Sequence, residues 1–202
     1  MLPTNLTLYS IDAVLILDSE GKRIYAKYYV PPHEDREAHS EFAPLANPTS
    51  LNTLTEQRDF ERNLFKKTHK QNADVLLLAD RVIVYKEVSD VAFYVIGSGL
   101  DENEAMLYNV VIGIRDSIEI LLKRSMDRRT CLENFDLLAL AVDETVDSGV
   151  ILETDPVIIA SRVSKAPESD ASVMNIELTE QGLNSIFSFA KGKLSEKLKQ
   201  FA

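Results

Sequence analysis

Three apolar runs follow one another closely in the middle of the chain, and their spacing constrains the fold more than any other feature. They are ADVLLLAD at residues 73–80, VIVYKEV at 82–88 and VAFYVIG at 91–97. Their β-branched and aromatic content predicts strands, with turns at Asp80-Arg81 and Ser89-Asp90. Because connections this short join antiparallel neighbours, the three runs predict consecutive strands of one antiparallel sheet.

Two more runs near the N-terminus predict a β-hairpin. Residues Tyr9–Leu17 and Arg23–Val30 are rich in apolar and aromatic side chains, and DSEGK separates them. Gly21 in this connection can take the positive φ that a tight hairpin loop requires. The sequence therefore predicts five strands in total.

Helices are predicted at three places by capping residues that precede apolar positions at helical spacing. The first helix runs to about Lys70, and the second, longest one to about Ser125. The third carries a stripe formed by Phe135, Leu138, Val142 and Val146, and Gly149 is expected to end it in the left-handed conformation. The predicted capping pairs are Thr53 with Glu56, Asp101 with Glu104, and Thr130 with Glu133.

The order of these elements predicts an α+β fold, with a five-stranded antiparallel sheet flanked by helices. We expect one domain over residues 1–155, with a long proline-rich loop at 31–50, followed by a linker and a C-terminal amphipathic helical extension over 156–202. That last helix has an apolar face and a lysine edge, so it could lie on an anionic membrane or dock in a protein groove. The acidity of the remaining chain favours a protein. Its apolar face comprises Leu183, Ile186, Phe187, Ala190, Leu194 and Leu198, and its edge Lys191, Lys193, Lys197 and Lys199.

Composition excludes several classes of function. The formal net charge of -10 gives no electrostatic support for binding nucleic acid or anionic lipid. No run approaches the roughly 20 apolar residues that span a bilayer, and the N-terminus lacks the pattern of a signal peptide. Cys131 is the only cysteine, which excludes an internal disulfide and a cysteine-based zinc site. We therefore expect a cytosolic protein.

The segment DETVDSGVILETDP at residues 143–156 gathers five carboxylates, those of Asp143, Glu144, Asp147, Glu153 and Asp155. Metal or acid/base chemistry would need these groups to converge, usually with histidine nearby, and the three histidines lie elsewhere in the sequence. We therefore interpret the segment as a solvated or partner-facing acidic surface. Acids in the last turn of a helix face the negative end of its dipole, so we also expect lysine or arginine side chains beside them.

Three weaker candidates have simpler explanations. The glycines of GSG at 97–99 suggest a phosphate cradle, but no Lys-Ser/Thr follows and acidic residues do, so a strand-to-helix turn explains them. His33 and His39 stand beside acids in the proline-rich loop, where exposed polar residues are expected rather than a metal site. Cys131 lacks a partner at motif spacing and is expected to be a small core residue. No cofactor or metal is expected.

Four stretches of the sequence carry a resemblance to a known family: SIDAVLILDSEGKRIYAKYY, VIVYKEVSDVAFYVIGSGLDENEAML, DETVDSGVILETDP and the tail beginning LTEQ. Together they resemble the coatomer zeta family of COPI coat small chains, within the wider group of adaptor small chains with the longin fold. The resemblance covers nearly the whole chain, and SGVILETDP with LTEQ is its most specific part. It implies a longin-like sheet with helices on both faces and a non-enzymatic role.

The resemblance also implies partners and a location. Such a chain is held by the α-solenoid trunk of the coatomer gamma subunit, beside the beta and delta subunits. The complex is recruited by Arf-family GTPases to the cytosolic face of Golgi membranes, through the large subunits, and its vesicles serve Golgi-to-ER and intra-Golgi transport.

One feature of related clathrin-adaptor small chains does not carry over. Those chains help to bind dileucine cargo signals with a basic residue shortly after the hairpin glycine, and Ile24 stands at that position here. An isoleucine cannot pair with an acidic or phosphorylated group. The remaining alternatives are a small chain of a clathrin-adaptor-type complex, another longin-domain trafficking regulator, a longin-type SNARE, which would need long heptads and an anchor, and a small hydrolase, which would need convergent histidines and acids.

Overall fold

The computed structural model describes residues 8–30, 51, 53–71 and 73–164. Within this part of the chain, five strands form one antiparallel sheet in the order β2-β1-β5-β4-β3. The predicted five-stranded antiparallel sheet is confirmed. Its strands are β1 (Ile11–Asp18), β2 (Arg23–Tyr28), β3 (Val75–Leu78), β4 (Arg81–Val88) and β5 (Val91–Gly97).

The strand connections are tight, as the sequence spacing predicts, with one shift. Gly21 has a φ of +76° between β1 and β2, and Ser89 has a φ of +54° between β4 and β5. Between β3 and β4 the turn lies at Ala79 and Asp80, with φ values of +53° and +58°, and not at Asp80-Arg81. Arg81 instead begins β4 and pairs with Leu78. Two successive positive φ values match the twist of the flanking strands, which places the turn one residue earlier.

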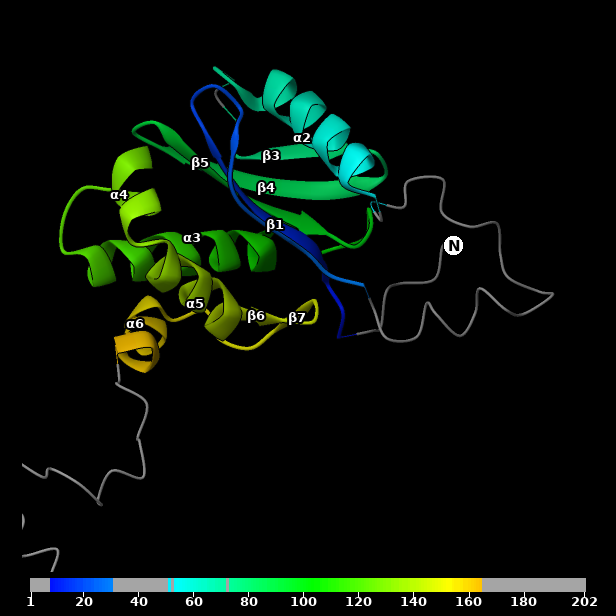
Figure 1. Cartoon of the computed structure of the whole chain (residues 1–202). Coiled ribbons are helices and arrows are strands. Elements are labelled where there is room, and N and C mark those ends of the chain that lie inside the picture. Colours follow the sequence, from blue (N-terminus) through cyan, green and yellow to red (C-terminus); the bar gives the residue numbers. More distant parts are fainter. Residues whose placement is uncertain (1–7, 31–50, 52, 72, 165–202) are drawn as a thin grey trace, which may run out of the picture. The chain divides into compact units, whose positions relative to one another are not determined.

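Helices cover both faces of the sheet (Figure 1). Helix α2 (Leu54–Thr68) lies alone on one face, and α3 (Glu104–Leu122) crosses the other with α4 (Arg128–Glu133), α5 (Phe135–Thr145) and α6 (Pro156–Ser164) beside it. Side chains of β1 alternate between the two faces of the sheet, so they contribute to two separate hydrophobic clusters. Val14 and Ile16 join the cluster packed on α3 and α5, while Leu15 and Leu17 join Phe60 of α2.

The predicted cap of α2 is confirmed. The predicted cap of α3, formed by Asp101 and Glu104, is wrong. The Thr53 hydroxyl accepts from the Glu56 N–H at 3.3 Å, and the Glu56 carboxylate accepts from the Thr53 N–H at 3.0 Å. Helix α3 is capped by Asn103, whose side-chain oxygen accepts from two backbone N–H groups of the first turn. Asp101 lies two residues too early to reach them.

The predicted third helix is two helices. Asp127, not Thr130, caps α4 by accepting from the Thr130 N–H at 2.7 Å. Helix α5 then ends at Thr145, and Val146 belongs to a small ribbon of β6 (Val146–Asp147) and β7 (Val150–Ile151). Gly149, with a φ of +82°, turns this ribbon rather than ending the helix.

A further helix occupies residues that we expected to begin a linker. Helix α6 spans Pro156–Ser164 and buries Ile159 and Ala160, so the expectation of a linker is wrong for these residues. The loop at 31–50, with His33 and His39, and the predicted C-terminal amphipathic helix lie outside the described residues. Among the helices that the structure describes, none has the length and apolar content to span a bilayer.

Candidate interaction surface around residues 143 to 155

The acidic segment leaves α5, contacts the start of β1 and then α3, and enters α6. We call residues 146–155 the strap. Its ribbon is fixed to β1: the Gly149 carbonyl accepts from the N–H groups of Ser10 and Ile11 at 3.0 and 3.1 Å. A Cβ at Gly149 would lie 2.7 Å from the Ile11 carbonyl oxygen. The positive φ and this close approach both explain why glycine stands here.

The strap also crosses α3 at very short range. A Cβ at Gly113, in the middle of α3, would lie 2.6 Å from the Thr154 carbonyl oxygen. Gly113 therefore removes the side chain that would hold the strap away from the helix. A glycine inside an apolar helix pattern is a sequence signal for such a close approach, and the predictions above do not include it.

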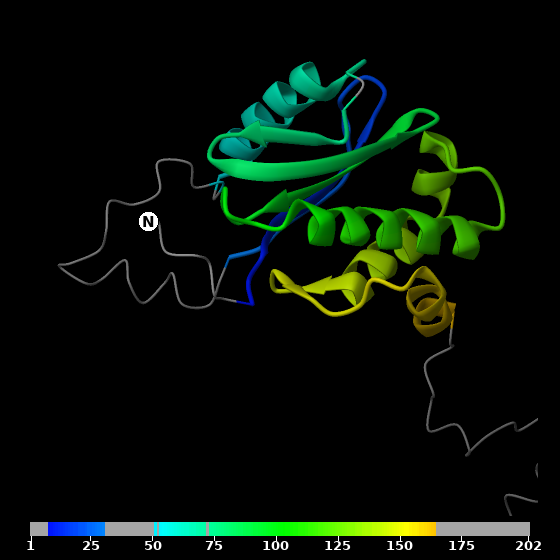
Figure 2. The ribbon, with the colours of Figure 1, turned by 180° about the vertical axis from the view of Figure 1, so that it is seen from behind.

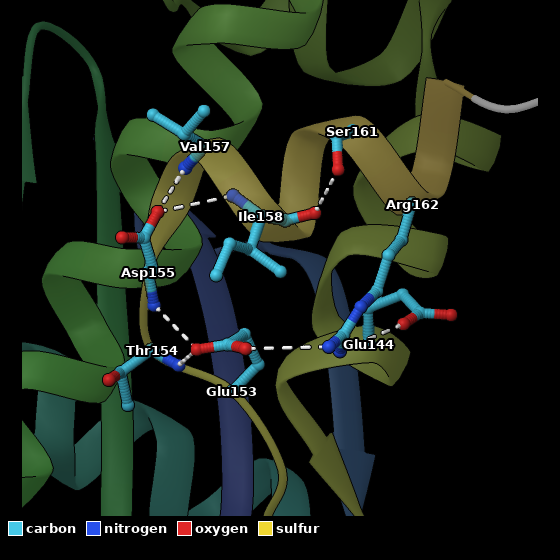
Figure 3. A network of polar contacts seen from close by, with 8 residues as sticks. All are labelled: Glu144, Glu153, Thr154, Asp155, Val157, Ile158, Ser161 and Arg162. Carbon is cyan, nitrogen blue, oxygen red and sulfur yellow. Dashed lines mark hydrogen bonds and ion pairs between the residues drawn. The ribbon is translucent and has the colours of Figure 1, made fainter.

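Two carboxylates of the strap organise the start of α6 (Figure 3). One Glu153 oxygen accepts from the N–H groups of Thr154 and Asp155 at 3.0 and 3.1 Å. These two backbone bonds are the main reason why the pKa of Glu153 is lowered. One Asp155 oxygen accepts from the N–H groups of Val157 and Ile158 at 2.8 and 3.1 Å, so Asp155 caps α6, with Pro156 as its first residue.

Cations lie beside the acids, as the helix dipole predicted. Arg162 of α6 lies 3.7 Å from the Glu144 carboxylate and 3.4 Å from that of Glu153. Lys27 of β2 lies 2.7 Å from Asp143. All three acids are partly exposed, so solvent screens these pairs and each adds little to stability. Through its two ion pairs, Arg162 links α6 to α5 and to the strap.

The five predicted residues do not converge on one point. Asp143 pairs with Lys27, Glu144 and Glu153 pair with Arg162, and Asp155 caps a helix. Asp147 is exposed, and among the described residues it pairs with the neighbouring Ser148 hydroxyl at 3.2 Å. The arrangement can fix the geometry of a surface and present charge on it. The sequence predicted that cations would lie beside these acids. It did not indicate which cations, because Lys27 and Arg162 come from other parts of the chain.

The other predicted positions have structural roles. The Cys131 side chain is buried, and burial raises the pKa of its thiol to about 11. Ile24 is buried in the core on the α3 side of the sheet, so it could not contact cargo from the surface. At 97–99, the Ser98 hydroxyl donates to Glu102 at 2.6 Å, and this acid lies where a bound anion would need positive groups.

Large apolar side chains remain exposed on α5, in the strap and at the start of α6. In α5, Leu140 is 49% exposed, and in the strap Leu152 is 54% exposed. In α6, Val157 and Ile158 are 64% and 40% exposed, and both stand at the cap formed by Asp155 (Figure 3). Neighbouring exposed apolar residues of this size often mark a surface that another protein covers.

A five-stranded antiparallel sheet between helices, with its acidic segment used for caps and ion pairs, defines an adaptor-type small chain with a longin-like α+β fold. A family model described as clathrin adaptor complex small chain matches residues 10–170. The chain belongs to this family.

Within the family, the similarity to coatomer zeta subunits that the sequence predicted is confirmed. The chain is 43% identical to "Coatomer subunit zeta" of Saccharomyces cerevisiae over 197 residues, which cover 98% of each chain. It is 38% identical to "Coatomer subunit zeta-1" of Homo sapiens over 188 residues, or 93% of this chain and 92% of that one. A chain of a structure titled "Homology model of the full-length AP-3 complex in a stretched open conformation" has the same fold, with a TM-score of 0.54, 18% identity, and coverage of 76% of this chain and 90% of that chain.

Proposed function

We propose that this chain is a non-catalytic subunit of the COPI vesicle coat that pairs directly with the coatomer gamma subunit. The similarity to coatomer zeta subunits along 98% of the chain carries the proposal. In this role the pair lies beside the beta and delta subunits in the adaptor-like part of the coat. It serves Golgi-to-ER and intra-Golgi transport from the cytosolic face of Golgi membranes, and the Arf-family GTPase is bound by the large subunits.

The surface around the strap is suited to such pairing. Caps and ion pairs fix its backbone before a partner arrives, which lowers the entropy lost on association. Leu140, Leu152, Val157 and Ile158 supply exposed apolar area. Asp147 and the exposed parts of the paired carboxylates supply negative charge that a basic partner surface would complement. We therefore propose that Asp143, Glu144, Asp147, Glu153 and Asp155 face the partner or position the residues that do.

Coexpression with the trunk of a coatomer gamma chain tests the proposal. We expect the two chains to copurify as a stoichiometric pair. Leu140→Asp should weaken this pair by at least about tenfold, since few buried apolar residues dominate most interfaces. Leu54→Asp is the matched control, because Leu54 is similarly exposed at 52% but belongs to α2 on the other face of the sheet.

Failure of the unaltered chain to copurify would overturn the pairing with gamma. Copurification with a large chain of a clathrin-adaptor complex instead would assign the chain to that class of complex. If Leu54→Asp and Leu140→Asp weaken the pair equally, the partner surface does not lie around the strap.

A further inference from the structure

The outer face of α2 is basic in a protein whose formal net charge is -10. Arg58, Arg62 and Lys66 succeed one another at intervals of four residues, which brings their side chains to the same side of the helix. Lys67 stands beside them, and Lys70 follows the end of the helix. All five residues are exposed. We call them the basic face.

Most of these charges are available for a ligand. Arg62 pairs with Asp59, whereas Arg58, Lys66, Lys67 and Lys70 have no ion-pair partner among the described residues.

The other acids of the helix are engaged elsewhere. Glu56 completes the capping box. Glu61 is buried, with 4% of its surface exposed, and its carboxylate holds Arg23 at 2.6 Å and the Tyr28 hydroxyl at 2.8 Å. The exposed cations of α2 outnumber its exposed acids, Glu56 and Asp59, so its net exposed charge is positive.

Helix electrostatics explains only part of this pattern. Lys66 and Lys67 occupy the last turn of α2, where a cation offsets the negative end of the dipole. The effect falls off within one turn. Arg58 and Arg62 lie too far from that end to be stabilised by the dipole, so the dipole does not account for the whole basic face.

Outside α2, the nearest acids lie at its C-terminal end, where Asp18, Glu87 and Asp90 line a pocket with Phe65 and His69, and the acidic strap, α5 and α6 lie further away. Helix α2 is the outermost layer on its side of the sheet, and the strap, α5 and α6 lie beyond the sheet on the other side (Figure 2). Packed layers are about 10 Å apart, so the acids of the strap, α5 and α6 are roughly 20 Å away. The Debye length at physiological ionic strength is about 8 Å. The sign of the local charge, not of the total charge, therefore decides what this face attracts.

We propose that the basic face of α2 binds the anionic lipid headgroups of a membrane surface. Protein interfaces are enriched in arginine but depleted of lysine, which supplies three of the five cations here, and they usually contain aromatic or apolar anchors. Within the described helix α2, Leu54 is the only large apolar residue that is exposed. Flexible cations on a protruding helix instead suit a flat surface whose charges can move laterally. The inference goes beyond the coat assignment, because it gives this chain a direct membrane contact of its own.

Sedimentation of the full chain with vesicles tests the inference. We expect binding to vesicles of phosphatidylcholine containing about 30 mol % phosphatidylserine, and none to pure phosphatidylcholine. Binding should fall as salt is raised from about 0.1 M, where the Debye length is about 10 Å, to 1 M, where it is about 3 Å. Each cation removed should weaken binding about fivefold, equivalent to about 1 kcal/mol.

Lys66→Gln with Lys67→Gln should therefore reduce affinity about 25-fold. Lys123→Gln with Arg124→Gln is the matched control: it changes the net charge equally, on exposed residues after α3, and should change affinity by less than twofold. Arg58→Gln lies outside the last turn of α2, so it should cost about fivefold without lowering stability through the dipole.

Three outcomes would overturn the inference. The first is an absence of binding to the anionic vesicles. The second is an equal loss of vesicle affinity in the α2 variant and in the control, which would show that net charge alone explains the effect. The third is unchanged vesicle binding with weakened copurification of the gamma trunk by Lys66→Gln with Lys67→Gln, which would make the basic face a protein interface.

Discussion

Gly113→Ala tests whether the strap depends on its close approach to α3. In an ordinary helix this substitution stabilises by about 1 kcal/mol, because alanine loses less conformational entropy. Here the added Cβ would lie 2.6 Å from the Thr154 carbonyl oxygen, whereas carbon and oxygen normally approach to about 3.3 Å. The strap would have to retreat by about 0.7 Å.

The obstacle is backbone held by hydrogen bonds, so we take the upper part of the overpacking range, about 3 kcal/mol. After the gain in helix propensity, a net loss of about 2 kcal/mol remains. For a protein of this size the loss corresponds to a fall in Tm of about 4 to 8 °C, measurable by circular dichroism or calorimetry.

Gly99→Ala provides the control for Gly113→Ala. No atom lies within 4 Å of a Cβ added at Gly99, so the free energy of unfolding should change by less than about 1 kcal/mol, in the stabilising direction if at all. A Gly113→Ala protein at least as stable as the parent would show that the strap moves freely, and the packing argument would be refuted.

Three further predictions concern stability. Gly149→Ala should lower the free energy of unfolding by about 2 kcal/mol in urea titrations, because its φ of +82° is strained for alanine, and an unchanged value would contradict this. Glu61→Ala should cost about 3 kcal/mol by removing the buried partner of Arg23, and a loss below about 1 kcal/mol would show that the pair is dispensable. Burial raises the pKa of Tyr94 to about 12 from about 10 in the unfolded chain, so its contribution to stability is complete below about pH 10 and is lost as pH rises to about 12. Melting curves across this pH range should show a smaller loss for Tyr94→Phe.

The strands could be predicted because their signal is local. Apolar runs joined by two residues leave one arrangement for neighbours in a sheet, and the structure has it at β3, β4 and β5. The cap of α2 was equally clear, since one residue pair satisfied the capping box. At α3, several polar residues within three positions could each cap the helix. Which one does so depends on where the backbone leaves β5, and the pattern does not contain that information.

The strap shows where sequence reasoning reaches its limit. A glycine with positive φ fits the end of a helix and the turn of a ribbon equally well. The hydrogen bonds that the Ser10 and Ile11 N–H groups donate to the Gly149 carbonyl decide between the two. Similarly, the Ser-, Lys- and Ala-rich run SRVSKAPESDAS at 161–172 predicted a linker, whereas α6 extends into its first residues and buries Ile159 against the core. Contacts between distant segments determine both outcomes.

The two proposed surfaces lie on opposite sides of the sheet, and different side chains support each of them. Residues of β1 alternate between the cluster beneath α2 and the cluster beneath α3 and α5, so neither surface shares its supporting side chains with the other. Binding at the strap and binding at the basic face should therefore be thermodynamically independent, because a coupling free energy requires an element that both ligands bias. The affinity of the gamma trunk should be equal with and without anionic vesicles once the local concentration at the membrane is taken into account. A difference greater than about fivefold, or roughly 1 kcal/mol, would show that the sheet transmits a change between its faces, and that its core is less rigid than its close packing implies.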